Sequence, residues 1–525
     1  MENTIFSILP PIIAIVMVLL TRRVLLSLGT GIVAAAVILT WFAPIEALQE
    51  LVLSFTIIFW DEGFNSYNVF IILFLLLLGI ITAFVSLSGG SHAFAEWAST
   101  RIKSRRGAKV LTVALGIIIF IDDYFNALTV GQVARPITDR YKVSRAKLAY
   151  FIDSTAAPVC VVSPVSSWGA AIIGIIATIL AGQTFVEYSA LEAFLWMAPM
   201  NFYVVASLAI VFFVAIRDVD FGEMKKHEVL AISKGQLFDP DKTIPGEMKE
   251  EFPSHSYGHV RDLLLPILLL IVGTVGAMIW TGYQNAGQVF DIWLIFENTD
   301  VPTSLLVGGI IGALTSIILY TLQIKKNETA NAGWIGKGIW AGIKSMMGAV
   351  LILIFAWSLT SLIGSLETGA YLANVVSEGN VPTAILPVLL FVLAGIMAFS
   401  TGTSWGSFGI LLPIAGTIMI EADPSLLLTA LSAVLAGAVF GDHCSPISDT
   451  TILSSTGAGS NHMDHVLTQI PYALTAAGIA AVGYIVIGFT GSLLISLGVV
   501  AVVLAVLFVF WSQRTTIIEK QQNTQ

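Results

Sequence analysis

Apolar segments of about 20 residues follow one another along almost the whole chain, and short polar connections separate them. A helix needs about 20 apolar residues to cross the hydrocarbon core of a bilayer, so this pattern predicts an all-α polytopic membrane protein with about 11 transmembrane helices. The composition agrees, because 56% of the 525 residues are hydrophobic and only 11% are charged. An ordinary soluble protein is excluded, and we expect no soluble domain and no nucleic-acid partner.

The connections differ in charge, and this difference assigns each of them to one side of the membrane. The basic connections, expected in the cytoplasm, are 22–23, 101–109, 135–147, 217–261, 325–344 and the tail after Arg514. The acidic or neutral connections, expected outside, are 43–68, 183–192, 283–302, 367–381 and 421–423. We therefore predict an integral membrane protein with its N-terminus outside, its C-terminus in the cytoplasm and membrane lipids around it.

Two apolar segments begin and end on the same side of the membrane, which predicts re-entrant hairpins. Residues 110–134 lie between two basic connections and are too short for two crossings. Their midpoint is the polar string Asp122-Asp123-Tyr124, where a hairpin tip is expected. Residues 382–420 lie between two external connections and are polar at 400–406. We expect this second hairpin to enter from the opposite side.

Two further apolar segments, 148–182 and 425–460, carry a similar interruption. The first contains Ser163-Pro164-Val165-Ser166-Ser167, and the second contains Ser445-Pro446-Ile447-Ser448-Asp449. Proline and clustered hydroxyls break a membrane helix and free backbone carbonyls. Paired breaks in two halves of a membrane protein indicate a transporter's ion or substrate site.

The order of spans, hairpin and broken helix recurs in the second half of the chain. We predict two inverted-topology repeats, each with a re-entrant hairpin and a broken helix, because an odd number of crossings per half reverses the second half. The predicted divisions are a first membrane repeat at 1–216, a cytoplasmic linker at 217–261, a second inverted repeat at 262–491, and an extra transmembrane helix with a cytoplasmic tail at 492–525.

The ionisable residues within the predicted membrane segments are acidic, apart from one histidine, and all fall in the four broken elements. They are Asp122, Asp123, Asp153, Asp442 and Asp449, with His443 beside one of them. An aspartate near the middle of a membrane helix costs about 2.5 to 3.5 kcal/mol on the insertion scale, so these acids must face the protein interior or water. Without Lys or Arg nearby, their counter-charge must be a proton or a bound cation. Burial favours the protonated form and a hard cation favours the ionised form, so Na⁺ and H⁺ are expected to compete.

The candidates for cation and proton binding are the polar residues of these four elements. They are Asp122, Asp123, Asn126, Asp153, Ser154, Thr155, Ser163, Ser166, Thr401, Thr403, Asp442, His443, Ser445, Ser448, Asp449 and Thr450. Within this set we expect a sodium ion at Asp122, Asp442 and Asp449.

Structural alternatives stay open for several candidates. Asp122 and Asp123 point about 100° apart on a helix, so one can cap the second hairpin arm while the other serves the ion. Asp153 can instead pair with Lys147, and His443 can be a hydrogen-bonded structural residue. The hydroxyls can simply satisfy backbone groups at the breaks. We expect five other histidines to be solvated in cytoplasmic loops; they are His227, His255, His259, His462 and His465.

Four strings in these elements carry a family resemblance. They are Phe120-Ile121-Asp122-Asp123-Tyr124-Phe125-Asn126, Asp153-Ser154-Thr155-Ala156-Ala157-Pro158, Ser163-Pro164-Val165-Ser166-Ser167-Trp168 and Gly441-Asp442-His443-Cys444-Ser445-Pro446-Ile447-Ser448-Asp449-Thr450-Thr451. They closely resemble those of NhaC-type Na⁺/H⁺ antiporters of the ion transporter superfamily. The resemblance implies a scaffold and a transport domain, an elevator-like motion, a homodimer, and antiport of Na⁺ against H⁺. Some similar proteins are malate/lactate exchangers or amino-acid carriers.

These observations predict a secondary active transporter and not an enzyme, with Na⁺ and H⁺ as transported ions and no cofactor. The alternative is coupled transport of a small organic acid or amino acid. An organic anion usually needs a cationic contact, and only helix N-termini at the hairpin tips could supply one here. An intramembrane aspartyl protease is disfavoured, because the Gly-x-Gly-Asp string of such enzymes is missing before Asp442.

Overall fold

The computed structural model describes residues 2–21, 23–120, 122–164, 166–180, 189–217, 219–244, 258–324, 331–368, 371 and 382–514. These residues form helices and connections, with one isolated β-bridge between Trp60 and Phe64. Nine helical stretches among them are long and apolar enough to cross a membrane. The predicted all-α polytopic fold is confirmed, whereas the count of 11 crossings and the inverted repeats stay predictions.

Some predicted segments lie partly outside the described residues. They are the first hairpin at Ile121, the first break at Val165, the end of the first broken segment at 181–182, the linker at 218 and 245–257, the tail after Arg514, and parts of the connections at 22–23, 183–192, 325–344 and 367–381.

The first half of the chain contains helices α1 to α12. Their bounds are α1 Leu9–Thr21, α2 Val24–Leu39, α3 Pro44–Thr56, α4 Ser66–Leu87, α5 Gly90–Arg101, α6 Arg105–Ile118, α7 Asp123–Arg140, α8 Arg145–Cys160, α9 Ser167–Leu180, α10 Ala190–Met200, α11 Phe202–Arg217 and α12 Gly222–Lys234. A short 3₁₀ helix, η1, precedes them at Ile5–Ile8.

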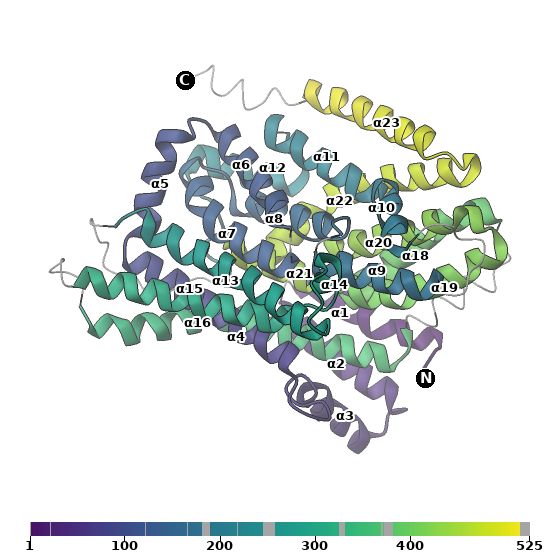
Figure 1. Cartoon of the computed structure of the whole chain (residues 1–525), viewed down its shortest axis with the longest axis horizontal. Helices are drawn as coiled ribbons and strands as arrows, with labels where there is room; N and C mark the ends of the chain where they lie inside the picture. The colour runs from purple at the N-terminus through teal and green to yellow at the C-terminus, as the bar shows by residue number, and fades with distance from the viewer. Residues whose placement is uncertain are drawn as a thin grey trace.

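The second half contains helices α13 to α23. Their bounds are α13 Arg261–Asn285, α14 Ile292–Glu297, α15 Val301–Ile324, α16 Gly333–Ser365, α18 Leu386–Thr401, α19 Ser404–Ala422, α20 Leu427–Cys444, α21 Asp449–Ala458, α22 His462–Thr490 and α23 Leu493–Arg514. The 3₁₀ helices η2 Thr383–Ile385 and η3 Pro424–Leu426 lead into α18 and α20. Figure 1 shows α21 near the centre of the molecule, α23 along one edge and α3 projecting from the opposite edge.

The segments for which the sequence predicts hairpins contain the helix pairs α6–α7 and α18–α19. The Asn126 side chain ties the first pair together, because its Nδ2 donates to the carbonyls of Gly116, at 2.5 Å, and Ile119, at 2.6 Å. The second pair turns at Gly402, whose φ of +72° lies in the left-handed region that favours glycine. A Cβ on Gly402 would lie 2.6 Å from the Ile447 carbonyl, so this tip packs directly on the connection between α20 and α21.

Hydroxyl groups satisfy the backbone where α8 and α20 end. After α8, the Ser166 hydroxyl donates to the Cys160 carbonyl at 2.6 Å and accepts from the backbone N–H of Gly169 at 2.9 Å. After α20, the Ser445 hydroxyl donates to the Phe399 carbonyl at 2.7 Å, and Ser448 caps α21. Side-chain oxygens thus replace part of the hydrogen bonding that each interrupted helix loses.

Two large hydrophobic clusters hold the helices together. One is built mainly by α10, α11, α18, α19, α20 and α22, and the other mainly by α2, α4, α7, α13 and α16. Helix α8 joins them, because Phe151 belongs to the first cluster and Ile152 to the second. Side chains that lie between the two clusters, as those of α8 do, are therefore shielded from lipid on both sides.

The polar helix α12 is fastened to the start of α8 by buried ion pairs. The Lys147 ammonium lies 2.6 Å from Asp220 and 2.8 Å from Glu228, and Arg105 of α6 also binds Glu228. Burial raises the pKa of the Glu228 carboxyl, but Lys147 and Arg105 outweigh it and hold the pKa at about 2. Part of the predicted linker is thus fixed on the first hairpin and the first broken helix.

Candidate cation and proton site

The two acids at the first hairpin tip have different surroundings. Asp122 is the N-cap of α7, and its Oδ1 accepts from the Phe125 N–H at 3.0 Å. Asp123 is 3% exposed, and its Oδ1 accepts from the indole N–H of Trp168 at 3.0 Å. Its Oδ2 is buried without a hydrogen-bond partner among the described residues. We call such a buried oxygen without a hydrogen-bond partner among the described residues an open oxygen, and Asp123 has one.

Asn126 adds a second open oxygen one turn further along α7. Its Nδ2 is held by the carbonyls of α6, while its Oδ1 is buried and has no hydrogen-bond partner within the described part of the chain. The neighbouring candidate Thr155 donates to the Phe151 carbonyl at 2.7 Å, so its hydroxyl serves its own helix. Ser154 is buried against the Tyr150 hydroxyl.

The second hairpin tip holds Asp442 in a similar way. The Ser404 hydroxyl, at the start of α19, donates to Asp442 Oδ2 at 2.7 Å. Asp442 is 1% exposed, and its Oδ1 has no hydrogen-bond partner among the described residues, although the Ser448 hydroxyl lies near the carboxylate. The hydroxyl of Thr401 bonds backbone carbonyls of the tip, and Thr403 is the N-cap of α19.

Asp449, in contrast, has both oxygens occupied. The Tyr124 hydroxyl of the first hairpin donates to Oδ2, and the Thr450 N–H donates to Oδ1 at 2.8 Å. The Thr450 hydroxyl bonds Ser448 at 3.0 Å. Asp449 thus links the first hairpin to the break in the second half, which puts the broken elements of both halves in contact.

Asp153 is surrounded by donors and does not pair with Lys147. It is fully buried, and it accepts from Thr451 at 3.2 Å, from Ser454 at 3.2 Å and from Gln469 at 2.5 Å. His443 bridges the Asp153 carbonyl and the Tyr203 hydroxyl, which is the structural role left open for it. At the first break, Ser163 is half-buried and its carbonyl accepts from Ser166.

The acids act on one another electrostatically across the two halves. Asp123 interacts with Asp122 and Asp449, and Asp442 interacts with Asp449 and Asp153. No three His, Cys, Asp or Glu side chains in the described ranges lie close enough to hold one metal ion. A cation here would therefore draw on one or two carboxylates together with amide, hydroxyl or carbonyl oxygens, which suits a hard monovalent ion. The sodium ion expected at Asp122, Asp442 and Asp449 stays a prediction.

Sequence reasoning missed several residues that build the site. Tyr124, Trp168, Ser404 and Gln469 donate to the acids. Tyr124, Trp168 and Ser404 lie within the polar strings of the hairpin tips and the first break, so their positions were a signal that the sequence offered. Gln469 gave none, because it is a single amide in a helix that follows a polar loop.

The expectation for two histidines was wrong. His462 and His465, expected to be solvated, are 2% and 0% exposed. The loop after α21 is short, so α22 packs on α21 and α8 from its first turn and covers both imidazoles. His259 is exposed, His227 is partly buried, and His255 lies outside the described residues.

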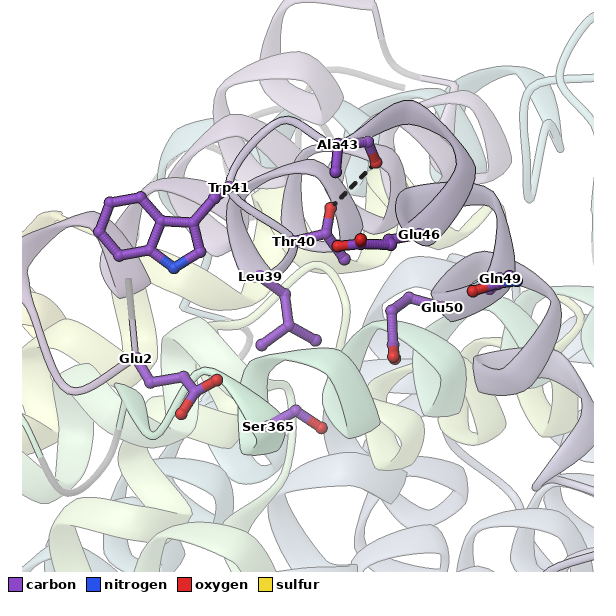
Figure 2. Close-up of a pocket in the computed structure, with 9 residues that line it drawn as sticks. All are labelled: Glu2, Leu39, Thr40, Trp41, Ala43, Glu46, Gln49, Glu50 and Ser365. Carbon is purple, nitrogen blue, oxygen red and sulfur yellow. Dashed lines mark hydrogen bonds between the residues drawn. The ribbon is translucent and has the colours of Figure 1, made fainter.

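A separate acid-lined cavity of about 720 Å³ lies where α2 and α3 meet the end of α16. Figure 2 shows Glu2, Glu46 and Glu50 around it, together with the exposed Trp41. The residues that line it belong to none of the four elements that carry the buried aspartates. We therefore treat it as part of the solvated surface.

Comparisons with known proteins place this arrangement in a family. The sequence profile of the Na⁺/H⁺ antiporter family matches residues 159–489, which include both breaks and the second hairpin. The chain belongs to the Na⁺/H⁺ antiporter family. This antiporter-family member is thus a secondary transporter that spans the membrane, and its resemblance to NhaC-type proteins is confirmed.

Three relatives show how the family member compares along its length. A protein of Haemophilus influenzae, described as uncharacterized, is 50% identical over 511 residues, covering 96% of this chain and 95% of its own. The malate-2H⁺/Na⁺-lactate antiporter of Bacillus subtilis is 28% identical over 236 residues, covering 44% of this chain and 45% of its own. An uncharacterized Na⁺/H⁺ antiporter of H. influenzae is 37% identical over 150 residues, covering 28% of this chain and 31% of its own.

Proposed function

We propose that this transporter exchanges Na⁺ for H⁺ at Asp123 and Asp442. The observation that carries the proposal is the state of their oxygens. Each carboxylate has one oxygen fixed by a donor, Trp168 or Ser404, and a second buried oxygen without a hydrogen-bond partner in the described residues. A buried acceptor without a hydrogen bond costs free energy. A proton or a sodium ion on the open oxygen removes that cost.

Competition between the two ions follows from the chemistry of a carboxylate. A proton on the open oxygen neutralises the group, whereas Na⁺ needs the ionised form and further oxygen ligands. The Asn126 Oδ1, three residues further along α7 and also buried without a hydrogen-bond partner among the described residues, is a candidate for such a ligand. The contacts of Asp123, Asp442 and Asp449 described above involve Trp, Ser, Tyr and backbone groups rather than Lys or Arg. The transported ion itself then supplies the positive charge.

Coupling is expected because the acids interact as one group. The charge of Asp449 acts on both open acids, Asp123 and Asp442. Its carboxylate also accepts a hydrogen bond from Tyr124 of the first hairpin. Binding at either acid changes the field at the others, so the proton load belongs to the cluster. Exchange then requires that the Na⁺-loaded and proton-loaded forms are the ones that move across the membrane.

The test is Na⁺-driven proton flux in proteoliposomes that contain the purified full-length chain and a pH-sensitive dye. We expect NaCl to dequench the dye with the unchanged chain, and we expect Asp123→Asn and Asp442→Asn to abolish the response. Asp61→Asn, which neutralises an exposed acid, is the matched control and should retain flux. Flux retained in both Asp123→Asn and Asp442→Asn, with normal insertion, would move the site elsewhere.

A second candidate is exchange of a small organic acid with the same ions. It is favoured by the similarity to the Bacillus subtilis malate-2H⁺/Na⁺-lactate antiporter. Among the described residues no Lys or Arg is shown in contact with Asp123 or Asp442, which disfavours it. Dequenching that needs malate or lactate in addition to Na⁺ would select this candidate over simple cation exchange.

We also propose the location and assembly expected from the sequence: the bacterial cell membrane, with the N-terminus outside and the C-terminus inside, and a homodimer. The loop charges support the orientation. Reporter tags at the two ends, assayed in intact cells, test it. Mass measurement of the detergent-free protein in lipid nanodiscs tests the dimer.

A further inference from the structure

A chain of polar groups runs from the second break to Asp153 through two buried histidines. His462 Nε2 lies 2.7 Å from the Pro446 carbonyl, which belongs to the break between α20 and α21. His465 Nε2 lies 2.9 Å from Gln469 Oε1. Between the two rings stands Ser455, whose Oγ lies 3.2 Å from His462 Nδ1 and 2.9 Å from His465 Nδ1.

The partners fix which ring nitrogens carry hydrogen. A carbonyl only accepts, so His462 Nε2 must donate to Pro446. Gln469 Nε2 donates to Asp153 Oδ2 at 2.5 Å and to the His443 carbonyl at 2.8 Å, which orients its Oε1 toward His465. His465 Nε2 must then donate as well. In the neutral state, therefore, both Nδ1 atoms are acceptors that face the Ser455 hydroxyl.

One proton is missing from this arrangement. The Ser455 hydroxyl has a single hydrogen, while three acceptors surround it: both Nδ1 atoms and the Thr451 carbonyl at 2.8 Å. With both rings neutral, at least one buried Nδ1 is left without a donor. One added proton completes the sequence Nδ1–H to Oγ and Oγ–H to Nδ1, so that both ring nitrogens are satisfied.

The positive charge of a protonated ring would lie beside a buried carboxylate, that of Asp153. His465 Nε2 lies 3.6 Å from Asp153 Oδ2, and both side chains are fully buried. The other groups that bond the Asp153 carboxylate, Thr451, Ser454 and Gln469, are neutral. The titratable groups that act on the rings are Asp153 on α8 and, for His462, the neighbouring ring of His465. The other charged or titratable groups on the elements packed around them are His443 on α20, Asp449 on α21, Arg135 on α7 and Arg145 on α8, which lie at Gly459, and Asp464 on α22, which faces His227 and Lys242.

We propose that His462, Ser455 and His465 form a proton-binding site, distinct from the exchange site proposed at Asp123 and Asp442, whose loading fixes the break at Pro446 and slows exchange at acid pH. A protonated ring donates a stronger hydrogen bond than a neutral one. The Pro446 carbonyl lies between Asp442 and Asp449 in the chain, so the loaded network stabilises the present geometry of the cation site. This effect on exchange rests on the proposed Na⁺/H⁺ exchange, whereas the proton site itself does not.

The proton site is tested without transport. Full-length chain labelled with ¹⁵N-histidine in nanodiscs is titrated by solid-state NMR over the range where imidazoles titrate, about pH 5 to about pH 9. Resonances are assigned with His462→Gln and His465→Gln, and the exposed His259→Gln is the control. We expect the two buried rings to take up one proton together, and we expect Ser455→Ala to uncouple them. Rings that stay neutral throughout, or that titrate independently of Ser455, would overturn the proposal.

The effect on exchange is tested by the pH profile of Na⁺-driven proton flux. His462→Gln should keep the maximal turnover of the unchanged chain at alkaline pH and should extend exchange to lower pH, with an unchanged KM for Na⁺. Proton competition at the acids instead changes KM, so the two effects separate. If the flux of His462→Gln still falls at acid pH as it does in the unchanged chain, the regulatory role is overturned. A chain that shows no Na⁺-dependent flux at all would refute the proposed function while the NMR titration still decides the proton site.

Discussion

Removing the Ser404 hydroxyl should weaken Na⁺ binding without removing a charge. This hydroxyl donates to the buried Asp442 carboxylate at 2.7 Å, while the other carboxylate oxygen is open. A hydrogen bond to a charged group contributes about 1.5 to 3 kcal/mol. Because Na⁺ needs the ionised carboxylate and a proton does not, Ser404→Ala shifts the competition toward the proton. At about 1.4 kcal/mol per tenfold, the apparent KM for Na⁺ should rise about tenfold to about 150-fold.

The matched control is Ser407→Ala, one turn further along α19. Ser407 is also fully buried, but its hydroxyl donates to the Thr403 carbonyl at 3.2 Å and not to an acid. Dye dequenching in proteoliposomes over a series of NaCl concentrations gives the apparent KM for each variant. We expect Ser407→Ala to match the unchanged chain. Equal KM values for Ser404→Ala and Ser407→Ala would refute the assignment of Asp442 Oδ2 as the anchored oxygen.

Three further predictions concern stability, measured by thermal unfolding in detergent. Lys147→Met leaves buried carboxylates without their ammonium and should cost about 3 to 5 kcal/mol, whereas Lys226→Met, at a side chain 70% exposed, should cost about 0 to 1 kcal/mol. Because the folded pKa of Glu228, about 2, lies below its ordinary value of 4.5, its stabilisation is present above pH 4.5 and is lost as the pH falls toward 2. Glu228→Gln should therefore flatten the acid limb of the stability curve; an unchanged limb would contradict this. Gly441→Ala places a Cβ 2.1 Å from a carbonyl of α18 and should prevent folding, while Gly478→Ala meets nothing within 4 Å and should be tolerated or slightly stabilising.

The acids could be found from the sequence because a charge in an apolar segment is conspicuous. Asp123 and Asp442 each interrupt a hydrophobic stretch, and a membrane charge must be compensated. Their chemical state could not be predicted, because it depends on donors distant in the chain. Trp168 lies 45 residues from Asp123, and Ser404 lies 38 residues from Asp442. Which oxygen is fixed and which is open is decided only when these elements pack together.

Adjacent acids could not be told apart for the same reason. Asp122 and Asp123 are chemically identical in the sequence, and one of them was expected to cap the second hairpin arm. In the structure Asp122 is the N-cap of α7 and accepts from the Phe125 N–H, while Asp123 accepts from the Trp168 indole. The helix boundary, set by one residue, separates a structural acid from a candidate ion ligand.

The sequence alone determined that the protein is a helical membrane transporter, because hydrophobic length and uncompensated charge are local properties that any fold of this chain must satisfy. Whether a residue beside a loop is buried is not a local property, because it depends on how distant helices pack. His462 and His465 adjoin a polar loop, and only the packing of α22 against α8 and α21 removes them from water and sets them beside Ser455 and Asp153. The tertiary structure therefore decided which polar groups work together, since hydrogen bonds join atoms that the chain order keeps far apart.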